Sequence, residues 1–408
     1  MLLSRFLQNS EGGVAMMAAL ATIPVFASVG AAVDLSRAAS MRSAMQAAVD
    51  ASVLAMAKDA KNAAATQLSE NATNFFKANF QNPEVGNLQF QVGASATSSG
   101  YAVNMSVKGS VKTKLMGVVG FSTLDVAVRS AAVSIMDGLG CVLALNPQTS
   151  AAINGPGSTS VTLNGCSLYD NSNHDTALTV GGSAQFTALS VGVVGNLTGA
   201  SNITTTNGIR TGIGAVADPY RYDHFPPFGG CTEHNLIAHG TITIEPGVYC
   251  GGMIINAGAD VTLNPGTYYI DGGKLTINGG ATVLGNGVTL VFTSQNRNGY
   301  ATASISGGAT INLTPPKIGP TAGIVMFGDR GMPTGAAFKL NGGATQYLGG
   351  AIYLPKAAVD FAGGSSTSAS CTQLIANTIA FTGNSKLLLD CNYYGTKPFS
   401  AVVVRLSS

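Results

Sequence analysis

The hydrophobic pattern near the start of the chain predicts one long helix with two different environments. Residues 14–33 contain no charged side chain, and twenty helical residues at about 1.5 Å each span roughly 30 Å, the hydrocarbon thickness of a bilayer. Beyond Asp34 large apolar residues recur every three or four positions, the period of a half-buried helix. They are Met41, Met45, Val49, Val53 and Met56. We therefore expect a cytoplasmic segment at residues 1–13, a transmembrane helix at 14–33, and a continuation of that helix into water.

A small α+β module is predicted next, over residues 34–136. Residues 67–80 show helical spacing of apolar side chains, and three later segments alternate apolar and polar residues as strands do. These segments are 87–92, 101–111 and 124–134. A long helix on a small antiparallel sheet is pilin-like in outline, which is an analogy of fold alone. The glycine-containing segment 137–140 is the expected boundary.

From about residue 138 the sequence repeats itself. The unit is an apolar residue, a small polar residue, Gly-Gly or a close variant, and then Ala or Ser, and its clearest copies start at 255, 277, 305, 340, 361 and 381. Spacings near 20 residues with insertions are typical of the coils of a parallel β-helix, whose tight bends use the positive φ of glycine. A Pro-Gly corner at 246–247 also returns at 265–266. We predict an all-β right-handed parallel β-helix (a solenoid) over 137–396, with a C-terminal tail at 397–408; a β-sandwich is the competing fold.

Composition agrees with a repetitive β architecture. Only 10% of the 408 residues are charged and 52 are Gly, whereas ordinary soluble domains contain about 25% charged residues and about 7% Gly. Disordered chains combine high charge with low hydrophobicity, which is a different composition. The net charge of +2 comes without a basic cluster, so we expect no nucleic-acid partner.

All six cysteines lie in the repetitive part, at spacings close to one coil. In a β-helix residues one coil apart stack at about 4.8 Å, which is within the Cα separation of about 4.4–6.8 Å that a disulfide accepts. The spacing predicts three sequential pairs, which are Cys141 with Cys166, Cys231 with Cys250, and Cys371 with Cys391. Such pairs indicate an oxidising compartment. Buried free thiols are the alternative, and zinc is less favoured because no Cys-x-x-Cys pair exists.

One insertion concentrates the polar and aromatic residues that could carry chemistry or recognition. It runs from residue 218 to 239, and its candidate recognition residues are Asp218, Tyr220, Tyr222, Asp223, His224 and His234. Parallel β-helices host polysaccharide-cleaving enzymes, whose sites need converging carboxylates. Here the other acidic residues are scattered, and no established ligand spacing appears. Solvated loop residues are the simplest interpretation, so we expect no catalytic residue, no metal and no cofactor.

The N-terminal third resembles a known family. Residues 11–15 (Glu-Gly-Gly-Val-Ala), 33–37 (Val-Asp-Leu-Ser-Arg) and 45–51 (Met-Gln-Ala-Ala-Val-Asp-Ala) surround and follow the apolar run. In that order they are similar to TadG-type proteins of the bacterial tight-adherence (Tad, or Flp) pilus-assembly systems, and the similarity continues to about Val133. Many members carry a von Willebrand-type domain next, whereas this chain has the β-helical repeats.

The resemblance implies a non-enzymatic pilus-assembly component. It implies a single-pass protein of the bacterial inner membrane, with membrane lipid around residues 14–33 and the C-terminal domain in the periplasm or outside the cell. Its expected partners are other Tad/Flp pilus-assembly proteins or minor pilins, and the exposed β-helix would serve scaffolding or adhesion on a surface glycan or protein. The positive-inside count slightly favours the reverse orientation, but the cysteines and the resemblance outweigh it. The alternatives are an exported β-helix enzyme acting on polysaccharide, or a secreted adhesin released by signal cleavage near residues 29–32.

Overall fold

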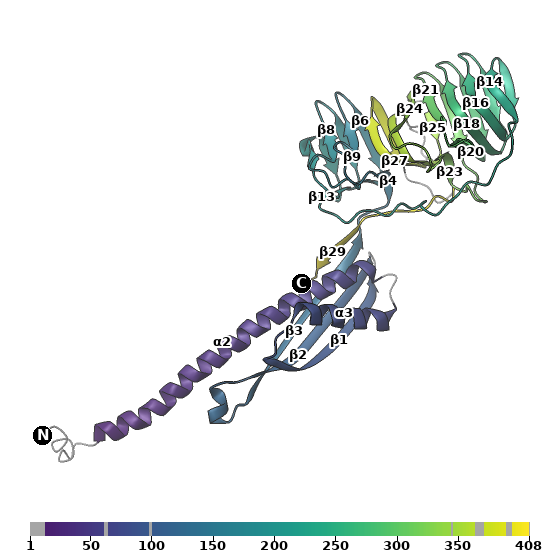
Figure 1. Cartoon of the computed structure of the whole chain (residues 1–408). Helices are drawn as coiled ribbons and strands as arrows, with labels where there is room; N and C mark the ends of the chain where they lie inside the picture. The colour runs from purple at the N-terminus through teal and green to yellow at the C-terminus, as the bar shows by residue number, and fades with distance from the viewer. Residues whose placement is uncertain are drawn as a thin grey trace. The chain divides into compact units, whose positions relative to one another are not determined.

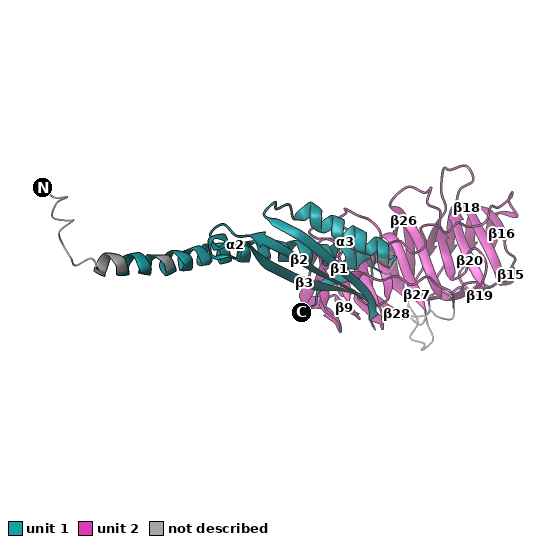
Figure 2. Cartoon of the chain, turned by 90° about the horizontal axis from the view of Figure 1, so that it is seen from below, with its two compact units in different colours: residues 1–135, 403–408 teal, residues 136–402 magenta. Residues whose placement is uncertain are grey.

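The chain divides into two compact units. The computed structural model describes residues 13–60, 64–97, 100–343, 346–363, 371–388 and 394–407. Unit 1 comprises Met1–Ile135 and Val403–Ser408, and unit 2 comprises Met136–Val402 (Figure 2). The chain therefore passes from unit 1 into unit 2 and returns at its C-terminal end.

Unit 1 is a long helix and a short helix on a four-stranded sheet (Figure 1). Its elements are α2 (Gly13–Asp59), α3 (Ala65–Asn79), β1 (Val85–Thr97), β2 (Gly100–Lys112), the 3₁₀ turn η1 (Met116–Val119), β3 (Thr123–Met136) and β29 (Val402–Leu406). Strands β1, β2 and β3 are antiparallel neighbours. The predicted helix and the three predicted strands of this module are all present, although α2 ends at Asp59 and α3 is a separate helix.

Helix α2 changes its surroundings along its length. Before Asp34 its apolar side chains are exposed, as at Phe26, which is 74% exposed. After Asp34 the face that carries Met45, Val49 and Val53 is fully buried against the sheet and α3. This is the half-buried pattern that the apolar period predicts. Among the described residues, α2 is also the one helix long and apolar enough to cross a membrane.

The C-terminal end of the chain completes the sheet of unit 1. Strand β29 neighbours β3 in the strand order β1-β2-β3-β29, and Val404 packs against the hydrophobic core of the unit. The tail that the sequence suggested at residues 397–408 therefore contains a strand. Its β-branched run at residues 402–404 is a strand signal that this prediction overlooked.

Unit 2 is built from short strands that pair in parallel (Figure 1). Its first series is β4 (Gly140–Ala144), β5 (Ile153–Gly155), β6 (Ser160–Asn164), β7 (Ser167–Asp170), β8 (Leu178–Val180), β9 (Gln185–Ala188), β10 (Val191–Val193), β11 (Leu197–Thr198), η2 (Ala200–Asn202), β12 (Ile203–Thr205) and β13 (Ile209–Thr211). Its second series is β14 (Glu233–Ala238), β15 (Thr241–Ile244), β16 (Gly247–Ile255), β17 (Asp260–Leu263), β18 (Gly266–Ile277), β19 (Thr282–Asn286), β20 (Val288–Thr293), β21 (Thr302–Ile305), β22 (Thr310–Thr314), β23 (Ile324–Gly328), β24 (Ala336–Gly343), β25 (Gln346–Leu348), β26 (Gly350–Gly363), β27 (Thr372–Phe381) and β28 (Asn384–Leu388).

The parallel pairing follows the repeat found in the sequence. Val261 of β17 pairs with Val283 of β19, which pairs with Ile311 of β22, and all three side chains are buried in the core. The glycines of successive repeat units, Gly280 and Gly308, both adopt positive φ, at 79° and 84°. An antiparallel β-sandwich does not account for these pairings. Six strands, β18, β20, β23, β26, β24 and β21, form a closed ring of parallel pairs.

The spatial order of the strands in the large sheet differs from their order in the chain. The large sheet runs β13-β10-β7-β4-β27-β26-β23-β20-β18-β16-β14. The first series therefore begins in the middle of the sheet at β4 and ends at one edge with β13. The second series begins at the opposite edge with β14 and ends in the middle at β27, beside β4. The two series meet where Leu374 of β27 pairs with Val142 of β4. In Figure 1 the yellow C-terminal strands accordingly stand between the teal and green strands.

The large sheet is covered on both faces. In β4, Val142 and Ala144 belong to the inner core, whereas Leu143 belongs to a second cluster on the opposite face. Successive side chains of a strand point to opposite faces, so a strand that is apolar at every position needs cover on both sides. The outer cover includes Val216, Tyr220, Phe399 and residues around them.

Candidate functional site

Residues 218–232 of the insertion singled out in the sequence lie in a strap over the outer face of the large sheet, and the rest of the insertion includes strand β14. The strap is defined here as residues 212–232, which join β13 at one end of the stack to β14 at the other. Its first part is fixed by Asn171, whose amide donates to the carbonyl of Val216 and accepts from the N–H of Val216, both at 2.8 Å. The strap is needed because β13 and β14 follow one another in the chain but lie at opposite ends of the large sheet.

Aromatic side chains on the underside of the strap fill the outer face of the sheet. Tyr220 is fully buried and lies 5.3 Å from the ring of Tyr353. Phe228 stacks on Tyr269 at 4.6 Å, and Phe225 meets Phe327 edge-on at 5.4 Å. Aromatic pairs of this kind contribute about 0.5–1.5 kcal/mol each beyond the burial of their area. Tyr220 is therefore used entirely for packing, whereas Phe225 and Phe228 pack on the sheet and remain partly exposed.

A polar network at the centre of the strap uses the acidic residues of the insertion. The hydroxyl of Tyr353 donates to Asp218 Oδ2 at 2.8 Å and accepts from Nε and Nη2 of Arg330 at 3.1 and 2.9 Å. Arg330 Nη1 also donates to the carbonyl of Asp223 at 2.6 Å, and Nη2 donates to the carbonyl of Tyr220. One guanidinium therefore ties two strap carbonyls to strand β26.

The remaining groups of this network are also satisfied. The hydroxyl of Tyr220 donates to Gln373 Oε1 at 2.9 Å and accepts from the N–H of Lys397 at 3.0 Å. The ammonium of Lys397 forms an ion pair with Asp223 Oδ1. Burial raises the pKa of the Tyr220 hydroxyl, and burial together with the Asp218 carboxylate raises the pKa of the Tyr353 hydroxyl. Both phenols therefore remain protonated donors at neutral pH.

The six candidate recognition residues separate into two groups. Asp218, Tyr220 and Asp223 hold the strap in place, so the structure gives them contacts within unit 2. Tyr222, which is 81% exposed, and His224 and His234 face solvent. Among the described residues, the histidines and the two carboxylates do not form a group of potential metal ligands. Sequence reasoning missed Arg330, which lies far from the insertion in the chain and carried no local signal.

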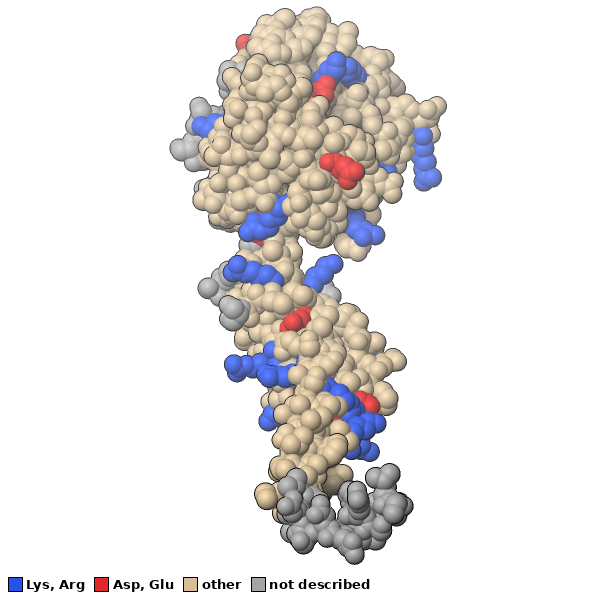
Figure 3. Space-filling view, turned by 90° about the vertical axis from the view of Figure 1, so that its left-hand side faces the viewer, with Lys and Arg blue, Asp and Glu red and all other residues tan. Residues whose placement is uncertain are grey.

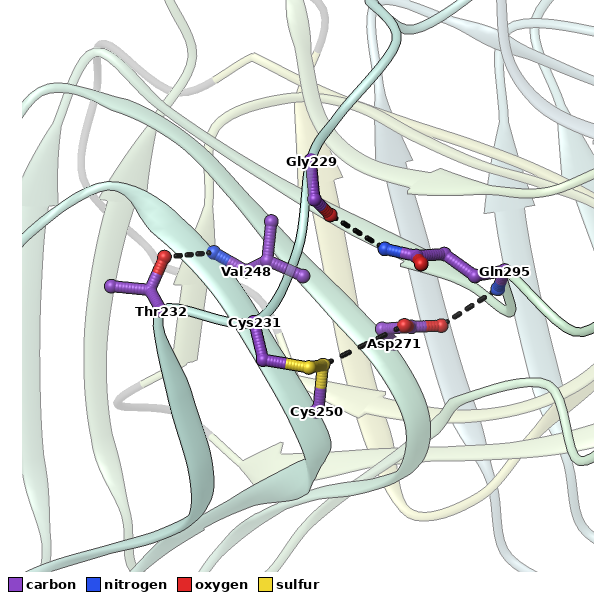
Figure 4. The surroundings of a disulfide bond; sticks show 7 residues. All are labelled: Gly229, Cys231, Thr232, Val248, Cys250, Asp271 and Gln295. Carbon is purple, nitrogen blue, oxygen red and sulfur yellow. Dashed lines mark hydrogen bonds between the residues drawn. A yellow bond between two sulfur atoms is a disulfide. The ribbon is translucent and has the colours of Figure 1, made fainter.

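A disulfide fixes the C-terminal end of the strap (Figure 4). Cys231 is bonded to Cys250 of β16, with 5.7 Å between their Cα atoms. Next to it, the N–H of Val248 donates to Thr232 Oγ1 at 2.9 Å, and the amide of Gln295 donates to the carbonyl of Gly229 at 2.6 Å. Asp271 Oδ2 lies 3.6 Å from the sulfur of Cys250, which is a packing contact because a disulfide sulfur has no proton.

Two of the three predicted disulfides are present in the described residues. The other joins Cys141 and Cys166, again with 5.7 Å between Cα atoms, and it is buried in the core. The third predicted pair includes Cys391, which lies outside the described residues, so that pairing stays a prediction. Cys231, His234 and Cys250 also form the one group of three potential metal ligands in the described ranges. Their two sulfurs are oxidised in the disulfide and are not thiolate ligands.

An open hollow lies beside the strap. Its volume is about 800 Å³, and it is lined by strap residues and by loops that follow β20 and β23. The lining includes Phe225, Phe228, Gln295, Arg297, Tyr300 and Asp329. Asp329 accepts from Thr293 Oγ1 at 2.6 Å and from the N–H of Gly331 at 2.8 Å. The hollow combines apolar rings with polar groups, which is a chemistry suited to binding.

One buried acid stands apart from the strap. The side chain of Asp170, at the end of β7, is fully buried. Its Oδ1 accepts from the N–H of Ser172 at 2.9 Å, while its Oδ2 has no hydrogen-bond partner among the described residues. Burial raises the pKa of this carboxyl from 3.8 to about 7. Such a shift marks many catalytic acids, but Asp170 has no exposed surface through which a substrate could reach it.

In unit 1, a second polar cluster surrounds Asp34 of α2. Its carboxylate accepts from the backbone N–H groups of Lys114, Leu115 and Met116 at 2.8–2.9 Å. These hydrogen bonds hold the pKa of Asp34 at about 2. Arg37, one helical turn on, pairs with Asp34 at 3.3 Å and with Glu84 at 2.6 Å. The Val-Asp-x-x-Arg motif thus joins α2 to the start of η1 and to the segment before β1.

The second motif of the N-terminal region also docks α2. Gln46 Nε2 donates to Asp50 Oδ1 at 2.8 Å and to the carbonyl of Arg129 in β3 at 3.0 Å. The polar residues of both motifs therefore orient the helix against the sheet. Sequence analysis recognised these residues as a family pattern without assigning them this role.

The comparisons with known proteins concern the same helix. Residues 12–59 match the Tad family, whose description reads "Putative Flp pilus-assembly TadE/G-like". The match ends with α2 at Asp59, and the rest of the chain is not assigned to a family. No curated protein and no solved structure matches the chain.

Proposed function

We propose that this protein is a non-enzymatic, membrane-anchored component of a Tad/Flp-type pilus-assembly system. In this proposal residues 14–33 cross the bacterial inner membrane once, with residues 1–13 in the cytoplasm. Unit 2 is a right-handed parallel β-helix that lies in the periplasm or outside the cell. The observation that carries the proposal is the Tad match over residues 12–59, because it coincides with a helix that is apolar and exposed before Asp34 and packed after it.

The two units would have separate tasks. Helix α2 would meet the helices of other Tad/Flp pilus-assembly proteins or minor pilins within the membrane. The stacked coils of unit 2 would offer an extended face for scaffolding or adhesion, as repeat proteins do. Only 10% of the residues of the chain are charged, and the face of the molecule seen in Figure 3 shows few charged side chains. The hollow beside the strap would offer Phe228, Tyr300 and Asp329 to a surface glycan or protein.

The polysaccharide-cleaving alternative receives no support from the strap. Catalysis on a glycan needs two carboxylates free to reach the scissile bond. Asp218 accepts a hydrogen bond from Tyr353, and Asp223 is paired with Lys397. The secreted-adhesin alternative requires cleavage near residues 29–32, which lie inside the continuous helix α2. We therefore retain the anchored reading as the single proposal.

Membrane fractionation of the native protein, with intact-mass analysis and thiol labelling, tests the anchor and the compartment. We expect a full-length chain in the inner-membrane fraction and no thiol labelling until a reductant is added. A soluble chain that starts near residue 32 would contradict the anchor. Labelling without reductant would contradict an oxidising compartment for unit 2.

Deletion of the gene tests the assembly role. We expect loss of Flp-type fibres from the cell surface, counted by electron microscopy, and restoration by the full chain. Restoration should fail when Gln46→Ala and Asp34→Ala loosen the helix from its sheet, provided that the variant still reaches the membrane. Normal fibres in the deletion strain would refute a role in pilus assembly.

A further inference from the structure

A loop of unit 1 lies against the part of α2 that is assigned to lipid. The loop connects β2 to β3, spans residues 113–122 and contains η1. Its residue Leu115 rests on Gly30, since a Cβ placed on Gly30 would lie only 2.9 Å from the Cβ of Leu115. Gly30 is buried by this contact. Because Gly30 precedes the end of the span at residue 33, the loop reaches the level of the bilayer.

The loop also exposes apolar side chains to solvent. Val118 is 89% exposed and Phe121 is 60% exposed, and Leu115 and Val119 are also exposed. On the adjoining helix Val33 is exposed as well. A group of apolar side chains at the surface marks an interaction site, and this group is continuous with the apolar surface of α2.

The loop is held rigidly in this arrangement. Asp34 caps three consecutive N–H groups at the start of η1. Gly120 ends the turn with a φ of 99°, and the N–H of Thr113 donates to the carbonyl of Ser122 at 3.1 Å to close the loop. The apolar residues are therefore presented by a fixed turn.

Basic residues border the apolar tip. Lys112 and Lys114 are exposed at the base of the loop, and Arg37 lies on the adjacent turn of α2. Two acids lie within this group: Asp34 pairs with Arg37, and Glu84 pairs with Arg37 and Lys114. Figure 3 shows Lys and Arg gathered beyond the uncharged end of the helix. Apolar residues bordered by Lys and Arg are the pattern of segments that enter the headgroup region of anionic bilayers.

We propose that residues 115–121 form an interfacial loop that inserts its apolar side chains into the leaflet from which α2 emerges. The occupant of this surface is the phospholipid bilayer itself. The inference rests on the proposed function in one respect, that α2 crosses a membrane. The loop then gives unit 1 a second attachment beside the helix and fixes both its depth and its rotation about the helix axis.

The absence of tryptophan from the sequence makes the loop directly testable. The chain contains no Trp, so Val118→Trp or Phe121→Trp supplies a single fluorophore in the full-length protein. Each variant is reconstituted into liposomes of phosphatidylethanolamine and phosphatidylglycerol that carry bromine at defined acyl positions. We expect at least twofold quenching of both loop probes, strongest with bromine close to the headgroup.

Two matched probes make the outcome unambiguous. Phe26→Trp, on the exposed apolar part of α2, reports the anchor and should be quenched most by deeper bromines. Phe75→Trp, at a partly exposed site on α3, should show no quenching. If the Phe26 probe is quenched and both loop probes are not, the loop proposal is wrong and the anchor stands. If the Phe26 probe is not quenched, the anchor fails and the loop proposal fails with it.

A second variant tests the role of the contact with the helix. Gly30→Leu would force Leu115 away from α2, because the added side chain occupies its place. We expect it to reduce the quenching of the Val118 probe while α2 stays in the membrane fraction. Unchanged quenching would contradict docking of the loop on the helix. A blue-shifted loop probe that bromine does not quench would mean that a protein partner, and not lipid, covers the loop, which overturns the proposal.

Discussion

Replacement of Asp170 by Asn should stabilise unit 2 in a manner that depends on pH. Asp170 is fully buried, and its Oδ2 lacks a partner among the described residues. Burial raises the pKa of its carboxyl in the folded protein from 3.8 to about 7. A raised folded-state pKa of an acid means that the native state binds more protons than the unfolded state. Its contribution to stability is therefore present at low pH and is lost as pH rises from about 4 to about 7.

The magnitude follows from the same pKa values. Each pKa unit corresponds to about 1.36 kcal/mol, so the interval from 3.8 to about 7 amounts to about 4 kcal/mol at pH 8. Asparagine keeps the acceptor for the N–H of Ser172 and resembles the protonated acid, which also carries no charge. We expect the variant to match the wild type near pH 4 and to exceed it by about 4 kcal/mol at pH 8.

Denaturant unfolding of the full chain in detergent, followed by the circular dichroism of the β structure, measures this difference. The series should run from pH 4 to pH 9 with disulfides intact. Asp175→Asn, at an exposed position nearby, is the matched control and should change stability by less than about 0.5 kcal/mol at every pH. A difference between Asp170→Asn and wild type that stays constant across the series would refute the reasoning, as would a variant that is less stable at pH 8.

Three further predictions concern the strap and helix α2. Arg330→Ala removes the guanidinium that binds two strap carbonyls, so we expect faster hydrogen exchange and proteolysis in the strap and a loss of about 2–3 kcal/mol; protection equal to wild type would contradict its role. Cys231→Ser opens the disulfide between residues 19 positions apart, which should cost about 3 kcal/mol in denaturant unfolding; with a reductant present, the variant and the wild type should be equally stable. Asp34→Asn removes an acid whose pKa is held at about 2. Its carboxylate stabilises the wild type at neutral pH, and this contribution is lost as pH falls from about 4 to about 2. The variant should lack this contribution at neutral pH. Hydrogen exchange of the three capped amides would then be faster, and unchanged exchange would show that the carboxylate does not hold the turn.

Local patterns predicted much of each unit. The apolar period beyond Asp34 identified the buried face of α2, and Met45, Val49 and Val53 are all buried there. The Gly-Gly repeat identified parallel stacking at a spacing of one coil, seen in the pairing of Val261 with Val283. Both features depend on short-range periodicity, which a sequence displays directly. The cysteine spacing predicted both observed disulfides for the same reason, since their partners are 25 and 19 residues apart, close to the spacing of the repeat.

The unusual composition of the insertion was visible in the sequence, but the sequence did not show that Tyr220 and Asp218 make contacts within unit 2. Tyr220 and Asp218 stood out in the sequence, yet their partners Tyr353 and Gln373 lie 130 or more residues away. Burial of an aromatic residue in a loop depends on which surface the loop covers. That surface was the outer face of strands whose continuous apolar runs, such as those of β4 and β23, already required a cover.

The sequence by itself determined the long N-terminal helix, the small sheet, the spacing of the repeats and the partners of the two observed disulfides, because each depends on residues close together in the chain. Only the tertiary structure decided that the stack begins in its middle, with β4 beside β27 and the strap crossing between the two ends. Parallel edges of successive coils present equivalent hydrogen-bonding groups, so any coil can pair with any other of matching register. The choice among them is made by side-chain packing between distant segments, such as Phe186 against Phe381, which no local pattern records.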